Sequence, residues 1–178
     1  MTGAPPTAVE LPYVSVARQK LIVMSMTTLS LYQLYWFYTN FQRMRARTGS
    51  GASPFWRAIA APITAHLLFS AVRTDAQSRF VTVRWSALGL AVIYFVLTLC
   101  CFLDYPWWTI TLLSVLALLP AHATMDAVNR TIAPDAPPTD SYSATDGFVI
   151  VVGIALTLIG LYFTREAKLF VEQLVDQL

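Results

Sequence analysis

The chain has 178 residues, of which 56% are hydrophobic and only 12% are charged, and its formal net charge is +2 at pH 7. Soluble domains carry about 25% charged residues, so a water-soluble protein of this composition would expose large apolar patches and associate. The composition therefore excludes an ordinary soluble domain and predicts an all-α, multi-pass membrane protein with one helical bundle. Four stretches without Asp, Glu, Lys or Arg approach the roughly 20 residues that a helix needs to cross a bilayer: 21–42, 85–103, 105–125 and 147–164.

The N-terminal residues 1–20 contain prolines and end in Arg18 and Lys20, and we expect a flexible tail there. The first span follows and ends in a dense aromatic run. Tyr and Trp gather where hydrocarbon meets headgroups, because their rings are apolar and their tips are wet. We therefore place Tyr35, Trp36 and Tyr38 at a membrane surface; together with Gln33, the run could instead line a pore or a headgroup slot.

Basic residues follow the first span, and seven arginines lie between positions 43 and 84. Lysine and arginine near a membrane surface attract anionic headgroups, each with about 1 kcal/mol. Positive-inside anchoring explains the same residues equally well, and no nucleic-acid-binding framework surrounds them. The candidates for headgroup contact are Arg43, Arg45, Arg47 and Arg57.

The next helix is expected to begin at Pro54, with Ser53 as its cap, and its charge-free part covers only residues 58–72. Pro62 should break or kink it. A short, kinked helix fits an interfacial or re-entrant position better than a crossing, although a fifth span stays possible. His66 would then lie in the membrane or its interface, either as a functional polar group or as a histidine bonded to water or backbone.

The positive-inside rule ranks the possible orientations. With four spans, one side holds eight basic residues, including all those from Arg43 to Arg84, and the other side holds Arg18, Lys20, Arg165 and Lys168. With five spans the division is equal. The rule therefore favours four spans, with the arginine-rich link inside and both termini outside.

The second and third spans are joined by a tight turn at residues 104–106, which predicts an antiparallel helical hairpin. Where the third helix leaves the membrane, spacings of three and four residues gather His122, Asp126, Asn129 and Arg130 on one side. Such a group could bind a proton, a cation or a lipid phosphate, or could be an ordinary wet helix end. His66, His122 and Asp126 would suffice for a weak metal site, but no local spacing supports one, so no metal or cofactor is predicted.

The last span carries a stripe of small residues, and residues 165–178 continue it as an amphipathic helix. Small residues let helix backbones approach closely. The stripe predicts tight packing, either within the chain or with a second copy in a homo-oligomer. Its members are Gly153, Thr157, Gly160 and Thr164.

Two strings resemble a family of uncharacterised bacterial inner-membrane proteins. Residues 31–41, Leu-Tyr-Gln-Leu-Tyr-Trp-Phe-Tyr-Thr-Asn-Phe, are similar to a Tyr-Trp-Phe-Tyr motif that is followed by Asn-Trp in that family, with Phe41 in place of the tryptophan. Residues 53–58, Ser-Pro-Phe-Trp-Arg-Ala, look like its Ser-Pro-Phe-x-Arg-Ala motif. The resemblance covers residues 21–75 and implies a bacterial cytoplasmic membrane, without implying an activity.

The sequence thus predicts a transmembrane domain over residues 21–164 between the tail and the C-terminal helix. The leading hypothesis is a non-enzymatic accessory or lipid-interacting protein that forms homo-oligomers and has no nucleic-acid partner. The alternative is an ion or solute channel or transporter with His66, His122 and Asp126 along its polar path. The third is an enzyme that acts on lipid, for which only Ser70 or Thr64 near His66 offers a nucleophile.

Overall fold

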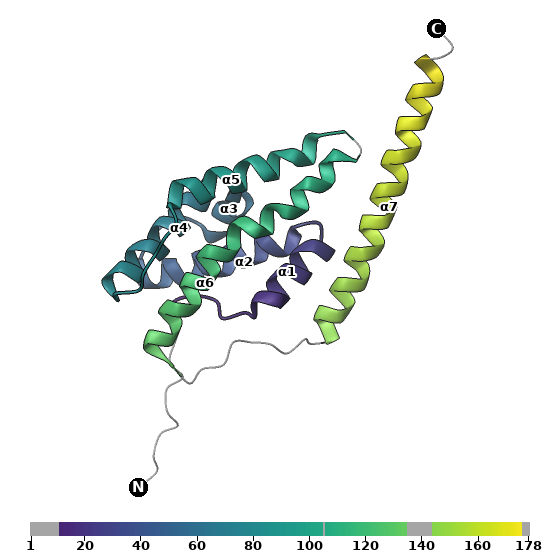
Figure 1. Ribbon diagram of the computed structural model, residues 1–178. Coiled ribbons are helices and arrows are strands. Elements are labelled where there is room, and N and C mark those ends of the chain that lie inside the picture. The colour runs from purple at the N-terminus through teal and green to yellow at the C-terminus, as the bar shows by residue number, and fades with distance from the viewer. Residues whose placement is uncertain (1–10, 105, 135–143, 176–178) are drawn as a thin grey trace.

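The computed structural model describes residues 11–104, 106–134 and 144–175, and these residues form helices without any strand. The all-α prediction is confirmed for this part of the chain. In chain order the elements in Figure 1 are α1 (Arg18–Thr27), α2 (Leu31–Thr48), α3 (Pro54–Ile59), α4 (Ala61–Ser78), α5 (Ala87–Leu99), the 3₁₀ helices η1 (Cys100–Phe102) and η2 (Trp107–Leu113), α6 (Ser114–Ile132) and α7 (Ala144–Val175).

The first apolar stretch does not form one helix, which corrects the predicted continuous span over residues 21–42. The chain reverses after Thr28, where Leu29 and Ser30 have φ angles of 52° and 68° in the left-handed region. The Thr28 hydroxyl donates to the Met24 carbonyl at 2.7 Å and accepts from the Tyr32 amide at 2.9 Å, which joins the two helices across the reversal. With 10 residues, α1 is about 15 Å long, too short to cross a bilayer.

The prediction that Pro62 breaks the third helical segment is confirmed. Helix α3 ends at Ile59, and Pro62 lies in the first turn of α4, where its missing N–H leaves no helical hydrogen bond unmade. The residues after the break form a continuous helix of 18 residues that packs against α5 and α6. The charge-free stretch is therefore the start of a bundle helix whose later turns carry Arg73 and Asp75.

The core lies between α2, α4, α5 and α6 and is rich in aromatic rings. The Phe37 ring of α2 is fully buried, and its centroid lies 5.3 Å from that of Tyr94 on α5 and 6.3 Å from that of Phe69 on α4. The predicted antiparallel hairpin of α5 and α6 is present and packs along its length (Figure 1). These contacts make α2 and α4–α6 one body.

Two of the described helical segments are long and apolar enough to cross a membrane, Trp107–Ile132 and Asp146–Phe170, and Ala87–Phe102 is a shorter apolar segment. In an apolar stretch of 18 residues within each segment, half of the residues are buried in the first and only 6% in the second. Helix α7 leaves the bundle after its first turns and extends alone (Figure 1). Length and composition thus single out α6 and α7 among the four expected spans.

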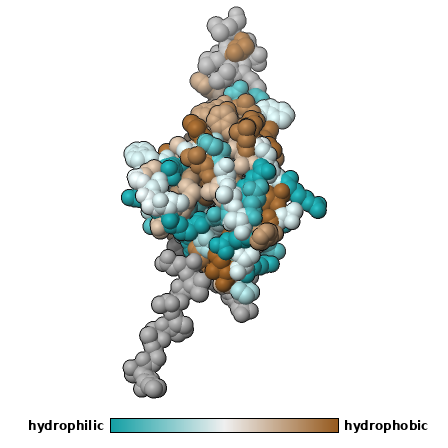
Figure 2. All heavy atoms as spheres, turned by 90° about the vertical axis from the view of Figure 1, so that its left-hand side faces the viewer, coloured by the Kyte–Doolittle hydropathy of each residue, from teal (hydrophilic) through white to brown (hydrophobic). Residues whose placement is uncertain are grey.

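Large apolar side chains cover the outside of α5 and α7. Seen from the left-hand side of Figure 1, hydrophobic side chains gather on the upper part of the face, at the height of α5, and hydrophilic ones lie mainly below (Figure 2). Exposing such side chains to water costs about 25 cal/mol per Å² of apolar surface, and extended apolar patches mark contacts with proteins or membranes. The exposed residues include Leu88, Val92, Ile93 and Val96 on α5, and Phe148, Val151, Leu158, Ile159 and Phe163 on α7.

The charged groups gather at the opposite end of the bundle from the η1–η2 turn. Arg47 near the end of α2 pairs with Asp75 near the end of α4 at 2.8 Å, and Asn129 lies in the last turns of α6. Residues 11–17 pass over this same end, because the Tyr13 amide donates to the Asn129 side chain at 3.2 Å. Residues 11–17 therefore lie at the same end of the bundle as Arg47, whereas the expected four-span topology places this segment and the arginine-rich link on opposite sides of the membrane; the topology itself stays a prediction.

Candidate functional site

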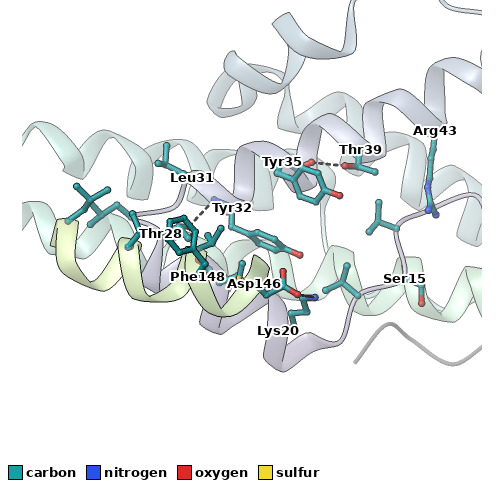
Figure 3. A pocket seen from close by; sticks show the side chains of 18 of the residues that line it. Ser15, Lys20, Thr28, Leu31, Tyr32, Tyr35, Thr39, Arg43, Asp146 and Phe148 are labelled. Atoms are coloured by element: carbon teal, nitrogen blue, oxygen red, sulfur yellow. Dashed lines mark hydrogen bonds and ion pairs between the residues drawn. The ribbon is translucent and has the colours of Figure 1, made fainter. Parts of the chain in front are cut away.

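A groove of about 850 Å³ lies between residues 11–16, the α1–α2 hairpin and the first turns of α7 (Figure 3). Its size falls within the range of roughly 300–1,000 Å³ that is usual for small-molecule sites. Segments far apart in the sequence form its walls. We therefore take the groove as the candidate functional site.

Helix α2 supplies one wall of the groove through a single stripe of side chains. Leu31, Tyr35, Thr39 and Arg43 recur every four residues, so they lie on one face of the helix and all line the groove. From Leu31 to Arg43 the helix rises about 18 Å at 1.5 Å per residue. The stripe changes along this length from an aliphatic side chain to a cationic one.

One end of the groove is apolar. Leu31 from α2 and Phe148 from α7 lie at this end in Figure 3. Leu31 is 60% exposed and Phe148 is 70% exposed, so the protein itself does not cover these side chains. The apolar lining there also includes Met24, Val152 and Leu156.

The other end of the groove carries the polar side chains of Ser15, Thr39 and Arg43 (Figure 3), and three aliphatic residues of the same N-terminal segment also line the groove: Leu11, Val14 and Val16. The Arg43 guanidinium donates through Nη1 to the carbonyl oxygens of Leu11, at 3.2 Å, and Tyr13. The guanidinium is thereby held at the groove while carrying its positive charge. Arg43, a predicted headgroup contact, thus lies at the polar end of the groove.

Helices α1 and α7 meet along the remaining wall. The Lys20 ammonium lies 2.6 Å from the Asp146 carboxylate, and seven residues further along each helix Gly153 packs against Thr27. A Cβ atom at Gly153 would lie 2.0 Å from the Thr27 carbonyl oxygen, so the contact requires glycine. The two helices therefore run in the same direction, in close contact.

Residues 11–17, which belong to the predicted flexible tail, are held by hydrogen bonds, and residues 1–10 of that tail lie outside the described residues. Tyr13 is fully buried; its carbonyl accepts from the Asn129 side chain at 3.1 Å, and its hydroxyl donates to Asp75 at 2.5 Å. The Val14 amide donates to Asn40 at 3.1 Å. Burial, together with the hydrogen bond to Asp75, raises the pKa of Tyr13 above its ordinary value. Residues 11–17 thus form a fixed part of the site.

The cluster predicted near the end of α6 is divided between two environments. His122 is buried, and its Nε2 lies 3.5 Å from Asp126 Oδ2, while neither ring nitrogen makes a hydrogen bond among the described residues. Asn129 binds the Tyr13 backbone instead, and Arg130 is exposed. The predicted helical spacing brings His122 and Asp126 together, and the charge of Arg130 also acts on Asp126.

His66 lies on the exposed side of α4, and its Nδ1 is 3.0 Å from the Ile63 carbonyl of the same helix. This geometry agrees with the backbone-bonded alternative. Thr64 donates to the carbonyls of Arg57 and Ala60, so its hydroxyl hydrogen is already used within α3 and α4. Ser70 is exposed. Among the described residues, no three His, Cys, Asp or Glu side chains gather closely enough to hold a metal ion.

The aromatic run points to three different places. Tyr35 lines the groove, and Tyr38 is exposed beside α3, where it borders a small hollow with Phe55. Trp36 instead faces the core and packs edge-on against His122 with 6.3 Å between ring centroids. The expectation of an interfacial Trp36 is corrected, because successive helical residues point in different directions and only part of the run reaches the surface.

The other arginines expected to hold headgroups also differ in their contacts. Arg47 pairs with Asp75 and lies over the Tyr13 ring, 4.8 Å from its centroid. Arg57 lies over the Phe41 ring at 5.8 Å, and Arg45 is exposed. Arg43 is the member of this set that lines the groove.

Of the small-residue stripe on α7, only Gly153 contacts another helix closely. Thr157 donates to the carbonyl of Gly153 in its own helix at 2.8 Å, and Thr164 is exposed. A Cβ atom at Gly160 would meet nothing within 4 Å. The stripe is therefore used for packing within the chain at Gly153, and pairing of two copies through α7 stays a prediction.

Sequence reasoning did not identify the groove. The stripe of residues on α2 can be recognised in the sequence by its four-residue spacing. The other walls come from residues 11–16 and from α7, and no local sequence pattern predicts that these segments lie next to α2. Comparisons with protein-family models, with curated proteins and with solved structures found no match. The resemblance to a family of inner-membrane proteins therefore stays a prediction.

Proposed function

We propose that the protein is a non-enzymatic, membrane-embedded protein that binds lipid. The observation that carries this proposal is the groove, which is apolar at one end, polar at the other and bordered by uncovered apolar side chains. Among the described lining residues there is no His or Cys, and Asp146 is paired with Lys20, so the groove offers binding groups and no nucleophile with an adjacent base. Lipid is the ligand class that combines both kinds of surface.

The proposed location is the cytoplasmic membrane of a bacterium, which the resemblance over residues 31–58 supports. Helix α7 supplies a complete crossing, because the 25 residues of Asp146–Phe170 rise about 37 Å, more than the roughly 30 Å of a hydrocarbon core. The positive-inside rule assigns the arginine-rich end of the bundle to the cytoplasm. The α1–α2 hairpin then enters and returns from that side, and α7 runs outward.

Cysteine labelling tests this arrangement in a chain whose native Cys100 and Cys101 are replaced by serine. Ser50→Cys, beyond the end of α2, should label from the cytoplasmic side. Gln173→Cys, which lies past Phe170 on α7, should label from the opposite side. Labelling of both positions from one side would contradict a crossing by α7.

Lipid binding is tested by exchanging the purified protein through a lipid-free detergent and measuring the lipid that remains by native mass spectrometry. We expect a bound lipid at a fixed stoichiometry. A matched helical membrane protein without a groove serves as control, since bulk annular lipid should wash away from both proteins. If the two proteins retain the same amount, lipid binding as the function is refuted.

The second candidate function is a path for protons or other ions, and the environment of His122 favours it. A buried imidazole that makes no described hydrogen bond, with a carboxylate at 3.5 Å, is a polar group held in the core at an energetic cost. About two turns before His122 on α6, Ser114 exchanges two hydrogen bonds of 3.0 and 3.2 Å with Gln33 of α2 in the core. Proton flux into liposomes that is lost in His122→Ala would support this candidate, and equal flux in both proteins would remove it.

A further inference from the structure

We propose that the groove binds a single bilayer phospholipid, with one acyl chain at the apolar end and the phosphate beside Arg43. This inference rests on the proposed function and adds to it the ligand class, its direction and the residues that hold it. Three observations carry it: the length of the groove, the order of polarity along it, and its opening towards the lipid-facing side of α7.

The length of the groove matches one leaflet. The α2 stripe from Leu31 to Arg43 rises about 18 Å, and half of a hydrocarbon core is about 15 Å. An acyl chain whose headgroup lies at the level of Arg43 would therefore end near Leu31. A ligand that spans both leaflets would exceed the groove, and a small polar solute would leave its apolar end unfilled.

The polarity along the groove follows that of a phospholipid. The hydroxyls of Ser15 and Thr39 lie with Arg43 at one end, and the side chains of Leu31 and Phe148 lie at the other (Figure 3). Lys20 and its partner Asp146 lie between the two ends. The cationic end is the end shared with the arginine-rich face of the bundle, so the chain would point from the headgroup region towards the membrane interior.

Arg43 suits an anionic headgroup such as a phosphate. Arg43 brings a positive charge and planar N–H donors to the groove, and its bonds to the Leu11 and Tyr13 carbonyls hold it there. Those bonds fix the guanidinium at the groove before the ligand arrives, which lowers the ordering cost of binding.

The groove opens towards the surface that α7 presents to lipid. Phe148 and Leu156 line the groove and are 70% and 49% exposed, on a helix whose neighbouring side chains are also exposed. A chain from the surrounding bilayer can therefore enter sideways without passing through water. Its contacts would cover apolar side chains of α1, α2 and α7 together.

The test uses the full-length protein in nanodiscs of phosphatidylethanolamine and phosphatidylglycerol, with a trace of phosphatidylglycerol that carries a photoactivatable group in its acyl chain. Cross-linked peptides are mapped by mass spectrometry. We expect them in α1, the first half of α2 and the first turns of α7. Val152→Trp fills the groove, and Val151→Trp, on an exposed position of the same helix outside the lining, is the matched control.

We expect Val152→Trp to reduce cross-linking in α2 about tenfold, which corresponds to about 1.4 kcal/mol, and Val151→Trp to leave it unchanged. Photoactivatable diacylglycerol, which lacks the phosphate, should label α2 less than the phospholipid does. Arg43→Gln should abolish that difference, and Arg43→Lys should preserve part of it.

Equal cross-linking in the two tryptophan variants, or cross-links spread evenly over α5 and α7, would overturn the groove as the binding site. In that case stoichiometric lipid retention in detergent would still support the proposed function. If diacylglycerol and phospholipid label α2 equally, the phosphate contact is refuted while the acyl-chain site stands. If the detergent-exchanged protein retains no lipid, the proposed function itself fails.

Discussion

The contact between Tyr13 and Asp75 permits a prediction whose size follows from the geometry. Tyr13→Phe keeps the buried ring and removes only the hydroxyl, which donates to Asp75 at 2.5 Å. A hydrogen bond to a charged group contributes about 1.5–3 kcal/mol to stability. Asp75 keeps its ion pair with Arg47 and is partly open to water, so the lower value applies. We expect a loss of about 1.5 kcal/mol, which lowers Tm by about 3–6 °C in a chain of this length.

The same contact also predicts how the stability of the protein depends on pH above about pH 10. Because burial and the hydrogen bond to Asp75 raise the pKa of Tyr13, its hydroxyl keeps its proton in the folded state above pH 10. The unfolded chain releases that proton near its ordinary pKa of about 10. Stability is therefore independent of this group below about pH 10 and falls as the pH rises further. Tyr13→Phe should remove this part of the fall.

The measurement is thermal unfolding in detergent micelles, followed by near-UV circular dichroism from pH 7 to pH 11. Tyr38→Phe, on an exposed ring, is the control and should match the wild type throughout. If Tyr13→Phe has the wild-type Tm at pH 7 and the same decline above pH 10, the hydroxyl does not stabilise the fold through Asp75.

Three further predictions concern other parts of the bundle. Gly153→Leu places side-chain atoms against the Thr27 carbonyl and should lower stability by about 1–3 kcal/mol. Gly160→Leu is the control and should leave Tm unchanged, because a Cβ atom there meets nothing within 4 Å. Equal effects of the two variants would contradict the close contact of α1 with α7. Asn129→Ala removes two hydrogen bonds to the Tyr13 backbone and should lower stability by about 1–3 kcal/mol, with faster proteolysis of residues 11–17 as the readout. His122→Leu removes a buried ring whose nitrogens make no described hydrogen bond, so Tm should hold or rise; a large fall in Tm would show a structural role for the imidazole.

Composition and apolar length predicted the helical class, the α5–α6 hairpin and the long α7, because each of these follows from local sequence. Pro62 also predicted correctly that the helix is interrupted before α4. The reversal at Leu29 and Ser30 could not be predicted in the same way. Neither residue is a usual left-handed turn residue, and the apolar pattern continues across them without interruption. The left-handed conformation is imposed by packing of α1 and α2 rather than by local preference.

The candidate site depended even more on tertiary structure. The sequence pointed to Arg43, Tyr35 and Gly153, and all three border the groove, but for separate reasons and without any indication that they meet. The burial of Tyr13 could not be predicted, because a single tyrosine in a Pro-containing segment is typical of a flexible tail. Its burial is possible because the side chains of Asn129 and Asn40 accept hydrogen bonds from the backbone amides of Tyr13 and Val14, which would otherwise be buried without partners.

The pairing of Lys20 with Asp146 joins residues that lie 126 positions apart. At the usual synthesis rate of about 5–20 residues per second, α1 leaves the ribosome about 6–25 s before its partner on α7. During that interval the groove has two walls and faces the bilayer along its whole length. The arrival of α7 is therefore the step that completes the proposed lipid site.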